Sequence, residues 1–180
     1  MRKPQRFEEF TTWFNPLNPE NNIQETIVEF LKDQSYDYSG KRIEYWFQHH
    51  KPGNKLDPHC DYNHKVRAKG TGGEWLHTYD RSIIMSPITI ACYLQITDLV
   101  GGELAISPYT WFEEPFPLTL NDDSFSKIYS SDVQYIAPEQ DDVLYFEGSK
   151  YYHWIQEVKH GERKSMMINF WPLDLGILEE

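Results

Sequence analysis

The sequence predicts a mainly β protein, a jelly roll of short strands preceded by a helical flank. Three observations support this fold class. Aromatic residues make up 16% of the 180 residues, and aromatic side chains favour strands. One amphipathic segment lies near the start of the chain. From Gly40 onward, about seven short β-type segments alternate with turns and long loops, an order typical of two packed antiparallel sheets.

The helix is expected after a proline-containing, irregular segment at residues 1–20. Apolar residues recur there at the spacing of a single helix face: Ile23, Ile27, Phe30 and Leu31. Asn21 or Asn22 can cap the first turn, because an asparagine side chain accepts from the free backbone N–H groups at that end.

The expected strands are rich in β-branched and aromatic residues and are bounded by Gly, Pro and Asn. They cover residues 43–50, 87–97, 103–106, 132–137, 143–147, 151–158 and 163–171. Segments 62–85 and 107–130 are expected to be long loops, and the first is either a substrate lid or a solvated loop. One domain is expected for residues 1–180, with the helical flank at 1–40 and the jelly-roll core at 41–173.

The composition argues against several classes of function. The formal net charge is -11, so general binding to nucleic-acid phosphates or to anionic membranes is not expected. The two cysteines, Cys60 and Cys92, form no CxxC pair and no disulfide framework. No run approaches the roughly 18 apolar residues of a membrane span. The simplest expectation is a cytoplasmic enzyme without a signal peptide.

His59 and Asp61 form a His-x-Asp pair, and residues i and i+2 of a strand point to the same face. With seven histidines and 28 acidic residues in 180, 7 × 28/180, or about one such pair, is expected by chance, and two occur. The other pair, His160 and Glu162, flanks Gly161 and is interpreted as part of a hairpin turn. Pro58 and the preceding Pro-Gly turn place His59 at the beginning of a strand, where an ion pair is the simpler reading.

His153 lies in an aromatic strand, where a histidine is more often a packed core residue than a ligand. Arg163 follows ten residues later and Ser165 two after that. On the last strand both are expected to face inward, where a buried Arg needs an anionic partner. A guanidinium with a neighbouring hydroxyl is well suited to bind a carboxylate.

Two imidazoles and one carboxylate on one face suit Fe(II) with open coordination positions, and a catalytic zinc can use the same ligand types. The Arg–Ser pair favours iron, because a 2-oxoacid co-substrate needs its far carboxylate anchored. The sequence therefore predicts a two-part site in which His59, Asp61 and His153 hold the metal.

From about Tyr45 to Trp171 the chain resembles the 2-oxoglutarate- and Fe(II)-dependent oxygenases, most closely the prolyl 4-hydroxylase-like branch. The similar segments are KPGNKLDPHCDYN, CYLQITDLVGGELAI and DDVLYFEGSKYYHWIQEVKHGERKS, with the final strand. The resemblance implies a double-stranded β-helix, a cupin-like form of the jelly roll.

The resemblance also implies the roles of individual residues. His59, Asp61 and His153 would be the catalytic iron ligands. Arg163, with Ser165, would grip the C5 carboxylate of 2-oxoglutarate, and Tyr93 would donate a hydrogen bond to it. The family's Gly-Gly turn corresponds to residues 101–102, which would be structural.

The chain departs from the family at two positions. His50 stands nine residues before the first implied ligand, where a Tyr is common. Asn169 stands near the end of the last strand, where a Trp is often found. Both changes fall on the co-substrate pocket and leave the implied iron ligands intact.

The implied activity is a dioxygenase that uses Fe(II), 2-oxoglutarate and O2, with ascorbate as a supporting reductant, and releases succinate and CO2. It would hydroxylate a C–H bond of a protein, a peptide or a small molecule, with peptidyl proline as one candidate. Two other readings stay open: a non-catalytic jelly-roll binding module, and a zinc hydrolase on the same scaffold.

Overall fold

The computed structural model describes residues 12–61, 68–69, 75–76, 88–110, 128–129 and 132–172. Within these ranges the structure has one helix longer than a single turn. This helix, α1, spans Asn22–Asp33. The Asn21 side chain accepts a hydrogen bond from the backbone N–H of Gln24 (3.1 Å), so Asn21, not Asn22, is the N-cap. The sequence-based expectation of a single amphipathic helix here is confirmed.

Five strands form the larger sheet, in the order β1-β2-β11-β6-β9, and every pairing is antiparallel. Their bounds are β1 Thr12–Phe14, β2 Lys41–His50, β6 Thr89–Gly101, β9 Val143–Phe146 and β11 Val158–Pro172. The long strands β6 and β11 lie side by side at its centre. β1 belongs to the segment expected to be a helical flank, and it extends the sheet at the edge.

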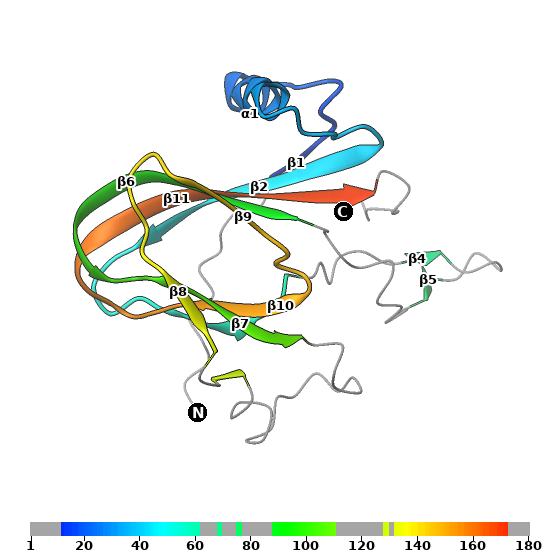
Figure 1. The fold of residues 1–180 in the computed structure, drawn as a ribbon. Helices are drawn as coiled ribbons and strands as arrows, with labels where there is room; N and C mark the ends of the chain where they lie inside the picture. The colour runs from blue at the N-terminus through cyan, green and yellow to red at the C-terminus, as the bar shows by residue number, and fades with distance from the viewer. Residues whose placement is uncertain are drawn as a thin grey trace.

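Four shorter strands form the second sheet, in the order β3-β10-β7-β8. They are β3 Leu56–His59, β7 Leu104–Thr110, β8 Gln134–Ile136 and β10 Tyr151–Ile155. Two-residue strands β4 Ala68–Lys69 and β5 Trp75–Leu76 pair separately. The two main sheets face each other and are joined where β6 turns into β7 and β10 into β11 (Figure 1). The fold is mainly β and is the expected double-stranded β-helix.

Apolar clusters cover both faces of the larger sheet. The helix lies above the outer face of the larger sheet (Figure 1), where Ile27, Val28 and Leu31 pack against residues of β2, β6 and β11. This burial gives the amphipathic helix the tertiary packing that stabilises it. Inside, Ala91, Tyr93 and Met167 pack with the flanking side chains Trp46, Ile96, Leu144 and Phe146. The inner face of the larger sheet therefore forms one wall of the barrel interior.

Several details of the sequence-based interpretation are wrong. His160 and Glu162 do not lie at a hairpin turn, because β11 runs unbroken from Val158 and the break between β10 and β11 falls at residues 156–157. Gly161, at φ +72°, instead marks a bulge within the strand. His59 ends strand β3 rather than beginning one. Residues 107–110 were expected to be loop but belong to β7. Most of segment 62–85, the possible lid, and most of the rest of segment 107–130 lie outside the described residues; within the first, 68–69 and 75–76 form β4 and β5.

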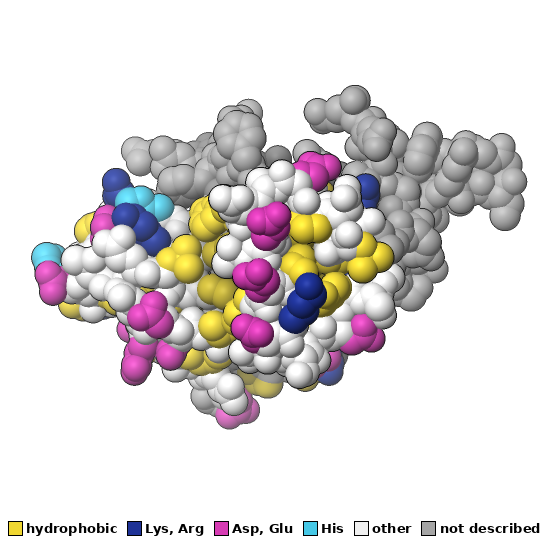
Figure 2. Space-filling view, turned by 90° about the horizontal axis from the view of Figure 1, so that it is seen from above, with side chains coloured by type: hydrophobic (Ala, Val, Ile, Leu, Met, Phe, Trp, Pro, Cys, Tyr) yellow, Lys and Arg dark blue, Asp and Glu magenta, His cyan; other side chains and the backbone are white. Residues whose placement is uncertain are grey.

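The face that carries α1 shows more acidic than basic side chains (Figure 2), in keeping with the net charge of -11. No helix within the described ranges combines the length and apolar character needed to cross a membrane.

Candidate functional site

His59, Asp61 and His153 come together at the interior edge of the smaller sheet. Strand β3 pairs with β10, and His59 and His153 are direct partners in that register. Their ring centroids are therefore only 4.3 Å apart. Asp61 follows β3 by two residues, and one potential ligand atom from each of the three residues lies within 4.8 Å of the others. Pairing of strands distant in sequence thus assembles the predicted triad.

The backbone fixes the orientation of both imidazoles. His59 Nδ1 lies 2.9 Å from the Asp57 carbonyl oxygen, and His153 Nδ1 lies 3.1 Å from the Tyr151 carbonyl oxygen. Because a carbonyl oxygen only accepts, each Nδ1 carries a hydrogen, and Nε2 is the ring nitrogen that is directed toward Asp61. The two Nε2 atoms lie 3.7 Å and 3.5 Å from Asp61 Oδ1. Such hydrogen bonds orient the histidine ligands of metal sites.

The charges of the triad also suit a cation. Burial raises the pKa of Asp61, but the neighbouring histidines and a hydrogen bond from Thr89 outweigh it and hold this pKa well below its usual range. Desolvation and then the charge of His153 lower the pKa of His59 to about 4. Near neutral pH, the group therefore contains an ionised carboxylate beside a neutral imidazole, the state in which these side chains bind metals.

Arg163 lies at the other end of the interior and is 1% exposed. Its Nη1 donates to the Gly102 carbonyl oxygen (2.7 Å), and Nη2 lies 3.5 Å from Ser165 Oγ. Among the described residues no acidic side chain forms an ion pair with it. Burial lowers the pKa of Arg163. An unneutralised buried cation is costly, so this position is suited to a bound anion.

Several buried polar atoms near Arg163 have no hydrogen-bond partner in the part of the chain that the structure describes. They include Tyr93 Oη, Arg163 Nε and Gln48 Oε1. Unsatisfied buried groups of this kind are rare and need an explanation, such as a ligand. Tyr93 pairs directly with Ser165 across β6 and β11, so these hydroxyls and the guanidinium belong to one patch.

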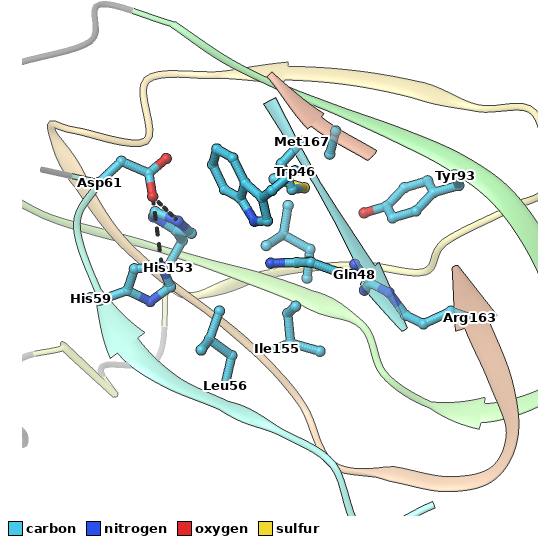
Figure 3. Close-up of a pocket in the computed structure, with 12 residues that line it drawn as sticks. Trp46, Gln48, Leu56, His59, Asp61, Tyr93, His153, Ile155, Arg163 and Met167 are labelled. Atoms are coloured by element: carbon cyan, nitrogen blue, oxygen red, sulfur yellow. Dashed lines mark ion pairs between the residues drawn. The ribbon is translucent and has the colours of Figure 1, made fainter. Parts of the chain in front are cut away.

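One cavity joins the two ends. His59, Asp61 and His153 line it at one side, and Tyr93 and Arg163 line it at the other (Figure 3). The remaining lining side chains are Trp46, Gln48, Leu56, Ala91, Leu104, Ile155 and Met167. Most of them are apolar, so the wall between the two polar ends is mainly apolar. The cavity therefore has three potential metal ligands at one end and a guanidinium at the other.

Trp46 and Gln48 of this cavity were not anticipated from the sequence. Gln48 projects between the triad and Arg163 (Figure 3). Both residues lie on β2, whose register places Trp46 opposite Met167 and Gln48 opposite Ser165. The sequence signal that could have identified them is the alternation of inward- and outward-facing residues along β2, read against the last strand. Using it required knowing that these two strands pair.

His50 and Asn169 are both buried, and neither lines the cavity. His50 is the register partner of Arg163. Burial, then the charge of Arg163, lowers the pKa of His50 to about 4. His50 therefore lies beside Arg163, on the neighbouring strand, as a neutral side chain. Cys60 is also buried away from the cavity lining.

The family model of the 2OG-Fe(II) oxygenase superfamily matches residues 45–171 of this chain. That range contains all the residues that line the cavity. No curated protein matches the chain significantly.

Among solved structures, iron-bound HygX from Streptomyces hygroscopicus superposes with a TM-score of 0.56 at 13% identity, covering 94% of this chain and 74% of that one. HygX with nickel and 2-oxoglutarate bound gives a TM-score of 0.55 at 13% identity, with the same coverage of 94% and 74%. These likenesses show the fold.

A viral collagen prolyl hydroxylase from Paramecium Bursaria Chlorella virus-1, in complex with 2OG, also matches, with a TM-score of 0.48 and 18% identity over 89% of this chain and 77% of that one. The chain spans 56% of the length of a Burkholderia pseudomallei oxidoreductase of the 2OG-Fe(II) oxygenase family that it also matches.

Proposed function

Because the chain belongs to the 2OG-Fe(II) oxygenase superfamily, whose members are oxidoreductases that use Fe(II) and 2-oxoglutarate, we propose that it hydroxylates a C–H bond of an organic substrate. The reaction would consume 2-oxoglutarate and O2 and release succinate and CO2.

The observation that carries this proposal is the two-ended cavity. A triad that offers two nitrogens and one carboxylate oxygen stands at one end. A buried guanidinium without an acidic partner among the described residues stands at the other. The 2-oxoglutarate molecule has the complementary shape, with a 2-oxoacid group that chelates a metal and a second carboxylate at its far end. The side chains of this cavity are therefore suited to bind both Fe(II) and 2-oxoglutarate.

In this proposal His59, Asp61 and His153 hold Fe(II). The Asp57 and Tyr151 carbonyl oxygens keep Nδ1 of each imidazole protonated, so that Nε2 faces the metal. The ligand set is the one that suits Fe(II) with open coordination positions. The carboxylate contributes negative charge, and burial strengthens its attraction to a cation.

Arg163 would bind the far carboxylate of 2-oxoglutarate, and Tyr93 and Ser165 would add hydroxyl groups beside it. The Gly102 carbonyl oxygen and the Tyr93 ring hold the guanidinium before any ligand arrives. Such preorganisation lowers the ordering cost of binding. The apolar walls, including Leu104 and Met167, keep water away from the co-substrate.

When bound, iron and 2-oxoglutarate supply the oxidising chemistry, in which loss of CO2 from 2-oxoglutarate accompanies transfer of one oxygen atom to the substrate. The residues of the chain supply binding, orientation and exclusion of water. For the substrate, the resemblance to prolyl hydroxylases supports peptidyl proline as one candidate, beside free amino acids and other small molecules. The expected cytoplasmic location stays a prediction.

The test is release of succinate from 2-oxoglutarate by the protein with Fe(II) and ascorbate, with His59→Ala as the control. Candidate peptides and metabolites are included one at a time, and mass spectrometry is used to find a product heavier by one oxygen atom. Iron-dependent succinate release that His59→Ala abolishes supports the proposal. Absence of both turnover and metal-dependent 2-oxoglutarate binding overturns it.

The same purified proteins also distinguish the two alternative functions from the proposed one. A zinc hydrolase would purify with zinc and act without 2-oxoglutarate. A non-catalytic binding module would bind a peptide or sugar without any metal.

A further inference from the structure

The two oxygens of the Asp61 carboxylate have different surroundings. Oδ1 faces the imidazoles, 3.7 Å from His59 Nε2 and 3.5 Å from His153 Nε2. Oδ2 points the other way and accepts a hydrogen bond of 2.6 Å from Thr89 Oγ1. The Asp61 backbone N–H donates to the Gly148 carbonyl oxygen (2.8 Å). Both the main chain and the far oxygen of this residue are thus held by partners outside the triad.

Thr89 is well placed to hold Oδ2 rigidly. It is 0% exposed and opens strand β6. Its backbone is paired on both sides, with Phe146 of β9 and with Asn169 of β11. A β-branched side chain also has restricted rotamers. The hydroxyl is therefore fixed relative to the larger sheet, and the carboxylate is tied to that sheet through it.

Gly148 completes the arrangement because there is no space for a larger residue. A Cβ at this position would collide with both Asp61 Oδ2 and Thr89 Oγ1. Its φ lies outside the left-handed region, so backbone conformation does not require glycine here. The space beside the hydrogen bond does. Glycine at 148 therefore lets the carboxylate and the hydroxyl meet while its carbonyl oxygen holds the Asp61 main chain.

We propose that Thr89 and Gly148 are positioning residues that restrain Asp61 to bind the metal through Oδ1 alone. A free carboxylate can bind a metal through one or two oxygens. Tying up Oδ2 prevents the second contact and leaves open the coordination positions that a chelating 2-oxoacid needs. This inference rests on the proposed function, and it concerns how the chain keeps that site open.

The experiment compares Thr89→Val, which removes the donor at nearly constant shape, with Thr89→Ser, which retains it. Each variant is loaded with Co(II), whose visible absorption reports coordination number and geometry. In parallel, calorimetry measures 2-oxoglutarate affinity with Mn(II) bound. We expect Thr89→Val to change the Co(II) spectrum and to weaken 2-oxoglutarate binding about 10-fold or more, the lower range for loss of an outer hydrogen bond. Thr89→Ser should match the unmodified protein in both.

Gly148→Ala tests the same restraint from the other side, since its Cβ must push the carboxylate and the hydroxyl apart. It should give the spectral change and the weaker binding of Thr89→Val, and it serves if that variant does not fold. Circular dichroism checks folding of each protein. Variants that fold and bind both Co(II) and 2-oxoglutarate as the unmodified protein does overturn the inference. Failure of the unmodified protein to bind metal or 2-oxoglutarate would instead reject the proposed function.

Discussion

The guanidinium of Arg163 lies over the ring of Tyr93, 4.9 Å from the ring centroid. Both side chains are almost fully buried, at 1% and 2% exposure. Arg163 Nε and Tyr93 Oη have no hydrogen-bond partner within the described ranges. The stacking stabilises the cation, but it provides no acceptor for the unused N–H group. The pair is thus held in place with hydrogen-bonding capacity that a carboxylate can use.

Arg163→Met should leave the ligand-free protein as stable as the original or more stable, by up to about 4 kcal/mol. The reason is that methionine fills the space without burying a charge that lacks an acidic partner. Urea unfolding of the metal-free protein measures this. Lys164→Met is the control, because Lys164 is only half-buried and its ammonium pairs with Gln95 at the surface, so little change is expected. A marked loss of stability in Arg163→Met would mean that the arginine is a structural residue.

Tyr93→Phe should weaken 2-oxoglutarate binding by about 1.5–3 kcal/mol, the value of a hydrogen bond to a charged group. Stability without ligand should not fall, because the hydroxyl has no partner within the described ranges. Calorimetry on the Mn(II)-loaded protein measures the affinity. Tyr135→Phe, at an exposed tyrosine of β8, is the control and should bind normally. Unchanged affinity in Tyr93→Phe would remove Tyr93 from the site.

His50 should make the protein less stable as the pH falls from about 6.5 to about 4. The folded state holds the pKa of His50 at about 4, mainly through burial and then through Arg163, so the unfolded chain takes up the proton first. In that window the free energy of unfolding should fall by about 1.4 kcal/mol per pH unit. His50→Gln should lack this contribution. Urea unfolding of both proteins at about pH 7.5 and about pH 5 measures it, and parallel losses in the two would contradict it.

Gly101→Ala should destabilise the protein more than Gly53→Ala. Both glycines have positive φ, +80° and +85°, so each substitution costs about 1–2 kcal/mol in backbone conformation. Only at Gly101 would a Cβ also collide with a backbone atom, the Glu157 carbonyl oxygen; nothing lies within 4 Å at Gly53. We expect this overpacking to add about 1–3 kcal/mol.

Gly101→Ala should also weaken 2-oxoglutarate binding, because the adjacent Gly102 carbonyl oxygen orients Arg163. Thermal unfolding and calorimetry of both variants give the two measurements. Equal stability of Gly101→Ala and Gly53→Ala would show that the turn relaxes around the new atom.

Much of the fold followed from local pattern. The apolar spacing of Ile23, Ile27 and Leu31 predicted α1, and clusters of aromatic and β-branched residues located most strands. The error at His160–Glu162 has a physical cause. Gly161 looked like a turn residue, but a glycine with positive φ can equally form a bulge within a continuous strand, as it does in β11.

The site was less accessible to local pattern. The superfamily and its cofactors could be predicted, and both predictions are confirmed by the family match. The structure brings His59, Asp61 and His153 together, and their role as iron ligands stays a proposal. Thr89, Gly148 and Gln48 could not be found from the sequence. Their importance depends on contacts between strands far apart in the chain, which residue spacing does not encode.

The most direct test of the two-ended site is calorimetric binding of 2-oxoglutarate with and without Mn(II), in the unmodified protein, His59→Ala and Arg163→Met. The account predicts that the unmodified protein binds 2-oxoglutarate only with metal present. Each substitution should reduce that binding by about 2 kcal/mol or more, as expected when one partner of a buried charge pair is removed. Arg163→Met should still bind Mn(II), whereas His59→Ala should not bind it tightly. Binding that is independent of metal, or equally strong in Arg163→Met, would contradict the account.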